Sequence, residues 1–193
     1  RYIRLSAVLL LLACGDGGTT PTSPPTPPAP VATSVTLSAT SLSFSSLGET
    51  SQLSATVKDQ NGATMSGASV TWSSSSASVA TVSSSGLVTA VANGSTTIKA
   101  TSGSASANAN ASIQQVAVSI TLSPDSLVFA ATGDTATVIA TVLDAGGSDI
   151  ASPSLTWASS DTTTVTVSSS GLVTAVASGP TPATVTAEID DQQ

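Results

Sequence analysis

GLVTAVANG, residues 86–94, returns almost unchanged as GLVTAVASG, residues 171–179. The two stretches lie 85 residues apart in a chain of 193 residues. A repeat of that length is too long for a solenoid unit and suits a small complete domain. The sequence therefore predicts two copies of one domain, arranged in tandem.

The repeat extends outward from this stretch at the same spacing. Toward the N-terminus, Trp72 recurs as Trp157 and Phe44 recurs as Phe129. Toward the C-terminus the spacing slips only beyond Gly179, where the second copy has a longer loop. We therefore expect domain 1 to span residues 31–115 and domain 2 to span residues 116–193.

Short runs within each copy alternate apolar and polar residues, as LSATV does at residues 53–57. Such a period of two is typical of β-strands that bury one face. Turn sequences separate the runs, with tight turns at residues 59–62 and 144–147 and hairpin tips at residues 85–86 and 170–171. About seven strands per copy predict an all-β fold of two tandem immunoglobulin-like β-sandwich domains.

Aromatic residues make up only 3% of the chain. Beyond the N-terminal segment they are Phe44, Trp72, Phe129 and Trp157, one Phe and one Trp in each copy. A sandwich needs a large residue between its sheets, so we assign these four to the cores. No aromatic residue is then left for a carbohydrate-binding platform or for stacking on single-stranded nucleic acid.

Charge and residue types also exclude several classes of function. The formal net charge is −7, with only four Lys and Arg residues, so nucleic acid is not expected as a partner. The chain has no His, and no Ser lies in a Ser-x-x-Lys arrangement, so we expect no catalytic residues and no enzyme activity. One cysteine excludes a disulfide within the chain.

Acidic residues in the turns could in principle hold Ca²⁺. Asp59 with Asn61, and Asp144 at the equivalent place, lie in turns, and Asp190 with Asp191 lies near the end of the chain. Calcium takes six to eight oxygen ligands, whereas two or three side-chain oxygens in a glycine turn usually close the turn. We therefore predict no metal site and no cofactor.

The N-terminal segment has the pattern of an export leader. Arg1 and Arg4 precede an apolar run, residues 5–13, that is too short to span a bilayer. The sequence LLAC at residues 11–14 resembles the lipobox of bacterial lipoproteins. This resemblance implies a signal peptide at residues 1–13, cleavage before Cys14, lipidation of Cys14, and attachment to a membrane. Gly15 after the cysteine favours the outer membrane.

Residues 14–30 follow as a lipid-anchor cysteine and a linker rich in Pro, Thr and Ser. Proline fixes φ and lacks an amide hydrogen, so this stretch can form neither helix nor ladder. We expect a disordered, extended spacer with a reach of roughly 50 Å.

The motifs of the two copies together resemble the bacterial Ig-like domain, group 2. The resemblance rests on the sequence around Trp72, on residues 79–82, on residues 86–94 and on residues 97–100, with counterparts in the second copy. It covers residues 31–193. The family's domain is a β-sandwich found in surface proteins, adhesins and phage structural proteins, and as an accessory module beside enzymes.

The end of each copy differs. Residues 104–113 place Ala at every second position, which predicts a final strand at a sheet edge of domain 1. The second copy stops at Gln193, where that strand should begin, and the chain starts without Met. We therefore expect a fragment in which domain 2 lacks its last strand.

These observations predict a non-catalytic cell-envelope lipoprotein at the outer membrane or cell surface. Its tandem domains would act as a displayed structural spacer or adhesion module, with a surface protein or a polysaccharide as the candidate ligand. The alternative is an accessory module of a larger secreted enzyme or polysaccharide-binding protein. A catalytic or lectin domain downstream would favour the alternative, and further Ig-like repeats would favour the spacer.

Overall fold

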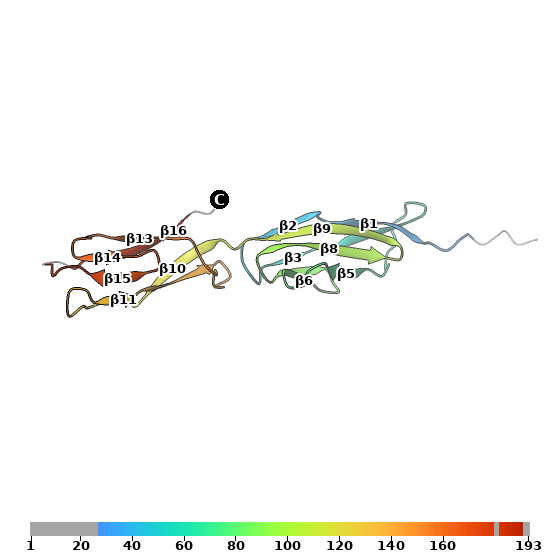
Figure 1. The fold of residues 1–193 in the computed structure, drawn as a ribbon. Coiled ribbons are helices and arrows are strands. Elements are labelled where there is room, and N and C mark those ends of the chain that lie inside the picture. The colour runs from blue at the N-terminus through green and yellow to red at the C-terminus, as the bar shows by residue number, and fades with distance from the viewer. Residues whose placement is uncertain (1–26, 180–181, 191–193) are drawn as a thin grey trace, which may run out of the picture.

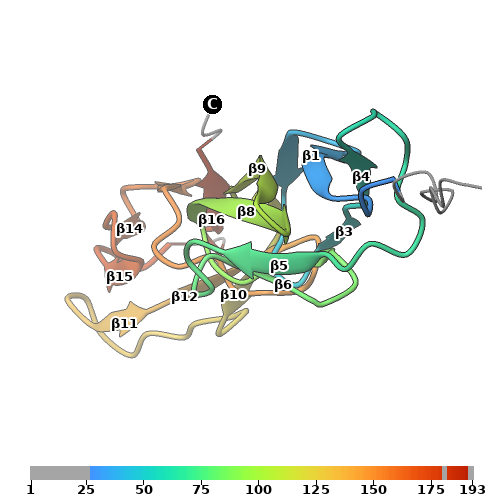
Figure 2. The same ribbon diagram turned by 90° about the vertical axis from the view of Figure 1, so that its right-hand side faces the viewer.

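The computed structural model describes residues 27–179 and 182–190, and every regular element among them is a β-strand. Two domains lie end to end (Figure 1), and Figure 2 views the molecule from the domain 1 end. The all-β, tandem-sandwich fold is thus as predicted. Signal peptide, Cys14 and most of the linker lie outside the described residues, and residues 27–30 are exposed and irregular.

Domain 1 contains nine strands. These are β1 (Ala32–Leu37), β2 (Ser41–Phe44), β3 (Thr50–Gln52), β4 (Ala55–Asp59), β5 (Thr71–Ser74), β6 (Ala80–Val82), β7 (Leu87–Ala90), β8 (Gly94–Ser102) and β9 (Ala105–Ile113).

Domain 2 contains seven strands among the described residues. These are β10 (Ala117–Ser123), β11 (Thr135–Thr137), β12 (Ile139–Asp144), β13 (Leu155–Ser159), β14 (Val165–Val167), β15 (Leu172–Ala175) and β16 (Val185–Ile189).

The sheets of domain 1 are organised around the long hairpin of β8 and β9. Its nine-residue strands pair antiparallel along their whole length, and they extend into a sheet with the order β2-β9-β8-β5. A second sheet has the order β3-β7-β6, and β1 pairs with β4. The predicted edge position of β9 is wrong, because β2 pairs with its free side in parallel and makes β9 an interior strand.

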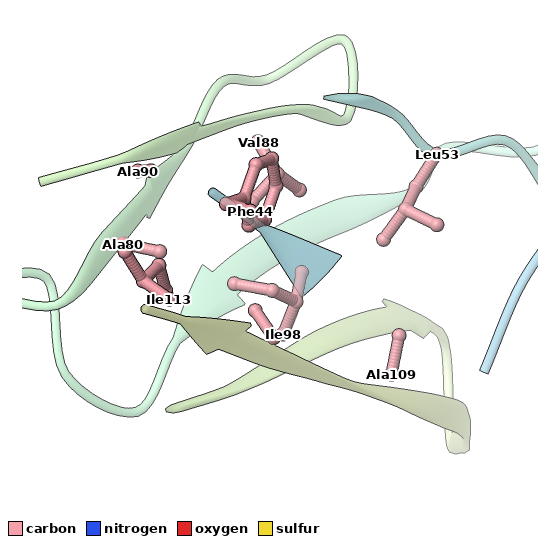
Figure 3. Packing of buried hydrophobic residues seen from close by; sticks show 9 residues of the cluster. Phe44, Leu53, Ala80, Val88, Ala90, Ile98, Ala109 and Ile113 are labelled. Carbon is pink, nitrogen blue, oxygen red and sulfur yellow. The ribbon is translucent and has the colours of Figure 1, made fainter. Parts of the chain in front are cut away.

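The core of domain 1 is built mainly from aliphatic side chains of both sheets. Phe44, Leu53, Val88, Ile98 and Ile113 point toward one another between the strands (Figure 3), and all are buried. Trp72 packs against this cluster and against a second one around Val35 and Val57. Its predicted place on the inner face is confirmed, although the side chain is only half-buried.

The hairpin tips form at the predicted positions, and glycine is required there. Gly86 has a φ of +85°, and a Cβ on it would lie 2.5 Å from the carbonyl oxygen of Leu53 and 2.9 Å from the Trp72 ring. Gly171 has the equivalent conformation beside Val138 and Trp157. This explains why a Gly opens the repeated stretch in both copies.

Domain 2 repeats this plan with two differences among its described residues. Its strands pair as β10-β12, β11-β15-β14 and β13-β16. Residues 126–129, the counterpart of β2, form no strand, and no counterpart of β9 lies among the described residues of this domain. The buried apolar residues of domain 2 are consequently few: Val138, Val142, Val173 and Ala175.

Candidate functional site at the domain junction

The two domains are joined by three residues, 114–116, between the end of β9 and the start of β10. The backbone N–H of Gln114 donates to the carbonyl oxygen of Phe44 at 3.0 Å, and that of Val116 donates to Ser45 at 2.8 Å. These bonds prolong the parallel pairing of β2 with β9 into the junction. The chain therefore leaves domain 1 as extended backbone, as the absence of Gly and Pro from this segment predicts.

Asp144, at the end of β12, is the centre of the contact between the domains. Solvent reaches only 2% of it. Its Oδ2 accepts hydrogen bonds from the backbone N–H of Leu47 in domain 1 and from Nε2 of Gln115, both at 2.9 Å. Its Oδ1 accepts from the backbone N–H groups of Gly146 and Ser148, at 2.9 and 2.8 Å. One carboxylate thus accepts hydrogen bonds from its own turn, from the interdomain segment (residues 114–116) and from domain 1.

The hydrogen bonds keep this carboxylate ionised. Burial alone raises the pKa of Asp144, but the bonds from Gln115, Leu47, Ser148 and Gly146 together outweigh it, and the pKa falls below its ordinary value. Bonds to an ionised acceptor are stronger than bonds between neutral groups. At neutral pH, two charge-assisted bonds therefore join Asp144 to Leu47 and Gln115, and two more close its own turn.

The amide of Gln115 contacts both domains. Its Nε2 also donates to the carbonyl oxygen of Asp149 at 3.2 Å. Its Oε1 accepts from Nδ2 of Asn93 at 3.1 Å, while its backbone N–H donates to Oδ1 of the same Asn93 at 2.8 Å. Gln115 therefore connects the β7–β8 loop of domain 1 to the turn after β12.

Close approach of the domains depends on Gly146. A Cβ on Gly146 would lie 2.7 Å from the carbonyl oxygen of Leu47. The counterpart in domain 1 is Asn61, whose turn faces no preceding domain among the described residues. The sequence placed Asp144 in a turn and did not predict its contact with Leu47. The two turns differ at two positions, with Ala145 and Gly146 in place of Gln60 and Asn61, and this difference was the available signal.

The other candidate oxygen ligands close turns or strand ends. Oδ1 of Asp59 accepts from the backbone N–H groups of Asn61 and Ala63, both at 2.9 Å. Asp190 accepts from the hydroxyls of Thr156 and Ser154, at 2.6 and 2.7 Å, and these bonds lower its pKa. Asp191 lies outside the described residues. Across residues 27–179 and 182–190, no three Asp, Glu, Cys or His side chains gather as a metal site would require.

Serine and threonine hydroxyls pair mainly with one another and with the backbone. At one end of domain 1, Oγ1 of Thr96 lies 2.9 Å from Oγ of Ser75 and accepts from the backbone N–H of Ser76 at 2.9 Å. This network contains no base that could take a proton from a serine hydroxyl. Its chemistry is that of a structural cluster that ties β5 to β8.

The family model of the bacterial Ig-like domain (group 2) matches residues 31–113 and again residues 116–193. The chain belongs to this family. Its tandem Ig-like domains account for both halves of the repeat, and the expectation based on the repeated motifs is confirmed. No curated protein matches the chain at a significant level.

Solved structures resemble the tandem Ig-like domains in fold alone. A crystal structure of the S-layer protein rSbsC is 23% identical, with a TM-score of 0.38, and covers 84% of this chain and 27% of its own length. Domains 5-6 of the S-layer protein SbsC are 23% identical, with a TM-score of 0.40, and cover 83% of this chain and 92% of that structure. Human protocadherin-24 EC1-2 is 14% identical, with a TM-score of 0.33, over 78% of this chain and 79% of that structure.

The chain thus spans about a quarter of the length of the longer S-layer structure. Within the described part of the chain, no helix has the length and apolar character needed to cross a membrane.

Proposed function

We propose that the chain is a non-catalytic cell-envelope lipoprotein whose two Ig-like domains form a stiff spacer at the cell surface. The observation that carries this proposal is the buried carboxylate of Asp144, which accepts hydrogen bonds both from domain 1 and from the interdomain segment, residues 114–116. Domains of one chain usually move relative to each other unless their interface restrains them. The short interdomain segment, the continued strand pairing and the charge-assisted bonds together restrain bending of one domain relative to the other.

The anchoring part of the proposal rests on the N-terminal sequence. Arg1 and Arg4, the short apolar run and Cys14 form a lipoprotein-type signal, and Gly15 favours sorting to the outer membrane. Acyl chains on Cys14 would hold the protein on the membrane, since each buried methylene contributes about 0.8 kcal/mol. The Pro-rich residues then carry the domains clear of the lipid surface, where a surface protein or a polysaccharide could meet them.

The stiffness of the spacer is tested by small-angle scattering on Asp144→Ala, with Asp59→Ala as the matched control. Asp144→Ala removes the acceptor of the Leu47 and Gln115 bonds, so the pair distance distribution should broaden and the mean radius of gyration should fall. Asp59→Ala opens the equivalent turn far from the junction, and it should leave the distribution of the wild type unchanged. Identical scattering from the wild type and Asp144→Ala would show that the carboxylate does not restrain the domains.

The anchor is tested in a host that processes lipoproteins. The wild-type chain should partition into the detergent phase and gain mass at Cys14, and Cys14→Ser should appear in the aqueous phase. A soluble wild-type product without added mass would rule the anchor out. Because this test reads only the N-terminus, it is independent of the scattering experiment.

A further inference from the structure

Two Asn-Gly steps lie in domain 1, and one of them lies at the domain junction. The chain has four asparagines, of which Asn61 and Asn93 precede a glycine. Asn61 lies in the turn after β4, at the other end of domain 1, whereas Asn93 lies in the loop between β7 and β8 and bonds to Gln115. In domain 2 the place of Asn93 is taken by Ser178. Of the two steps, that at residues 93–94 is therefore the one that touches the contact between the domains.

An Asn-Gly step favours deamidation of the asparagine, because glycine has no side chain that would hinder the attack. The backbone nitrogen of Gly94, after loss of its proton, attacks Cγ of Asn93. A bond from this nitrogen to Cγ forms, the bond from Cγ to Nδ2 breaks, and Nδ2 leaves as ammonia with the proton that the backbone lost. Water then opens the cyclic imide, and the product at position 93 is either aspartate or isoaspartate.

The structure both exposes the Asn93 side chain to water and restrains it. Asn93 and Gly94 are exposed. Oδ1 of Asn93 accepts from the backbone N–H of Gln115 at 2.8 Å, and Nδ2 donates to Oε1 of Gln115 at 3.1 Å. Gly94 begins β8 and pairs with Ile113 of β9. Both reacting groups must leave these positions before they can meet, so the reaction depends on local opening at the junction.

Loss of Nδ2 would change what the amide of Gln115 can bind. Its Oε1 accepts from Asn93, while its Nε2 donates to Asp144 and to the carbonyl oxygen of Asp149. A carboxylate at position 93 has no donor at neutral pH, so Oε1 would face an acceptor, or the amide would turn over and withdraw Nε2 from Asp144. Either arrangement removes a hydrogen bond from the junction. It also adds a second negative charge to the network that contains the ionised Asp144, and like charges repel.

We propose that Asn93 is a deamidation site which Gln115 protects, and that its conversion loosens the domain junction irreversibly. The reaction consumes only water and releases ammonia. A closed junction keeps Asn93 intact, whereas each local opening allows the reaction to proceed. The product therefore accumulates in chains whose junction has opened often. The protection by Gln115 does not depend on the lipid anchor, and the effect on bending rests on the proposed stiffness of the spacer.

The protection is tested by the rate of deamidation in the chain of residues 1–193 at mildly alkaline pH. Peptide mapping by mass spectrometry follows Asn93 and Asn61 separately, and a synthetic peptide of residues 90–97 gives the unprotected rate, which should be the fastest. Gln115→Ala removes the bond to Nδ2, so it should speed the reaction at Asn93 about fivefold, the factor expected for one hydrogen bond of ordinary net strength. Gln114→Ala is the matched control, because that side chain is exposed, and it should leave the rate unchanged. Neither variant should alter the rate at Asn61.

The effect on the junction is tested by small-angle scattering on Asn93→Asp, which should broaden the pair distance distribution as Asp144→Ala does. Equal deamidation rates at Asn93 in the wild type and Gln115→Ala would overturn the protection, and so would equal acceleration by Gln114→Ala. A broadened distribution for Asp144→Ala with none for Asn93→Asp would overturn the loosening. No change in either variant would overturn the stiff junction as well, and the deamidation rates would still decide whether Gln115 protects Asn93.

Discussion

At the scale of single residues, Gly86 shows how the hairpin tip before β7 can pack directly against the core of domain 1. Its left-handed backbone brings the hairpin tip against the carbonyl oxygen of Leu53 and the ring of Trp72, and no Cβ fits between them. Gly62 has a similar φ of +77° with open space around it. A comparison of Ala substitutions at these two glycines therefore separates the cost of the backbone conformation from the cost of a steric clash.

We predict that Gly86→Ala destabilises domain 1 considerably more than Gly62→Ala. Both variants incur the left-handed conformation, which costs about 1–2 kcal/mol for a residue with a side chain. Gly86→Ala adds a clash in a packed region, which costs about 1–3 kcal/mol more. Urea unfolding followed by the fluorescence of Trp72, in a Trp157→Phe background, measures the difference. Equal losses would mean that the hairpin tip moves away without cost.

Single residues also show how far the sequence could predict the site. Trp72 and Gly86 were predictable because each recurs in the second copy and has a local physical reason. Asp144 recurs as well, as Asp59, yet only Asp144 bonds to another domain. That contact depends on which face of one domain meets the end of the other, and a pattern repeated within each domain carries no information about it.

At the scale of elements, the turn that precedes β14 contains a carboxylate that should make domain 2 sensitive to acid. Oδ1 of Asp161 accepts from the backbone N–H of Thr163 at 2.9 Å and from its hydroxyl at 2.6 Å, and Oδ2 accepts from the Thr164 hydroxyl at 2.6 Å. The Thr163 and Thr164 hydroxyls lower the pKa of Asp161 to about 2. Domain 1 has Ser76 at the same place.

We predict that domain 2 loses stability as the pH falls from about 4 to about 2. The folded pKa of Asp161 lies below its unfolded value, so the contribution is complete above the unfolded value and disappears as the pH falls through the folded one. Asp161→Asn should flatten this part of the profile without abolishing it, because Asp144 and Asp190 also have lowered pKa values. The stability of domain 2 at each pH is measured by the fluorescence of Trp157 in a Trp72→Phe background. An unchanged profile in Asp161→Asn would contradict the assignment.

The strands themselves were predictable to different degrees. The alternating alanines of residues 105–113 predicted β9, because a period of two is a local property. Its interior position was not predictable, since β2 lies more than sixty residues earlier in the chain and is only four residues long. The sequence also did not predict that residues 126–129 form no strand, because the pairing of such a segment depends on a distant part of the chain.

At the scale of the whole molecule, the two domains should differ in stability. Domain 1 buries its core under β9, whereas an apolar cleft, lined by Leu127, Phe129 and Val185 among others, opens into the described part of domain 2. A stability of about 5–15 kcal/mol for a typical domain leaves little margin for that lost burial.

We therefore predict that domain 2 unfolds at a lower urea concentration than domain 1 in the chain of residues 1–193. Each domain has one tryptophan, so Trp72→Phe leaves a reporter in domain 2 and Trp157→Phe leaves one in domain 1. The two single-tryptophan chains should give separate midpoints, with that of Trp157 lower. Coincident midpoints would show either equal stability or unfolding of the pair as one unit.

The parallel pairing of β2 with β9 also determines how the molecule would respond to tension. A pull on the N-terminal end of β2 and on the C-terminal end of β9 acts in opposite directions on two parallel strands. The strands are then loaded in shear, and all their ladder bonds must break together, whereas bonds that are peeled break one after another. A tethered chain under flow would therefore keep domain 1 folded until the whole β2–β9 ladder gives way at once.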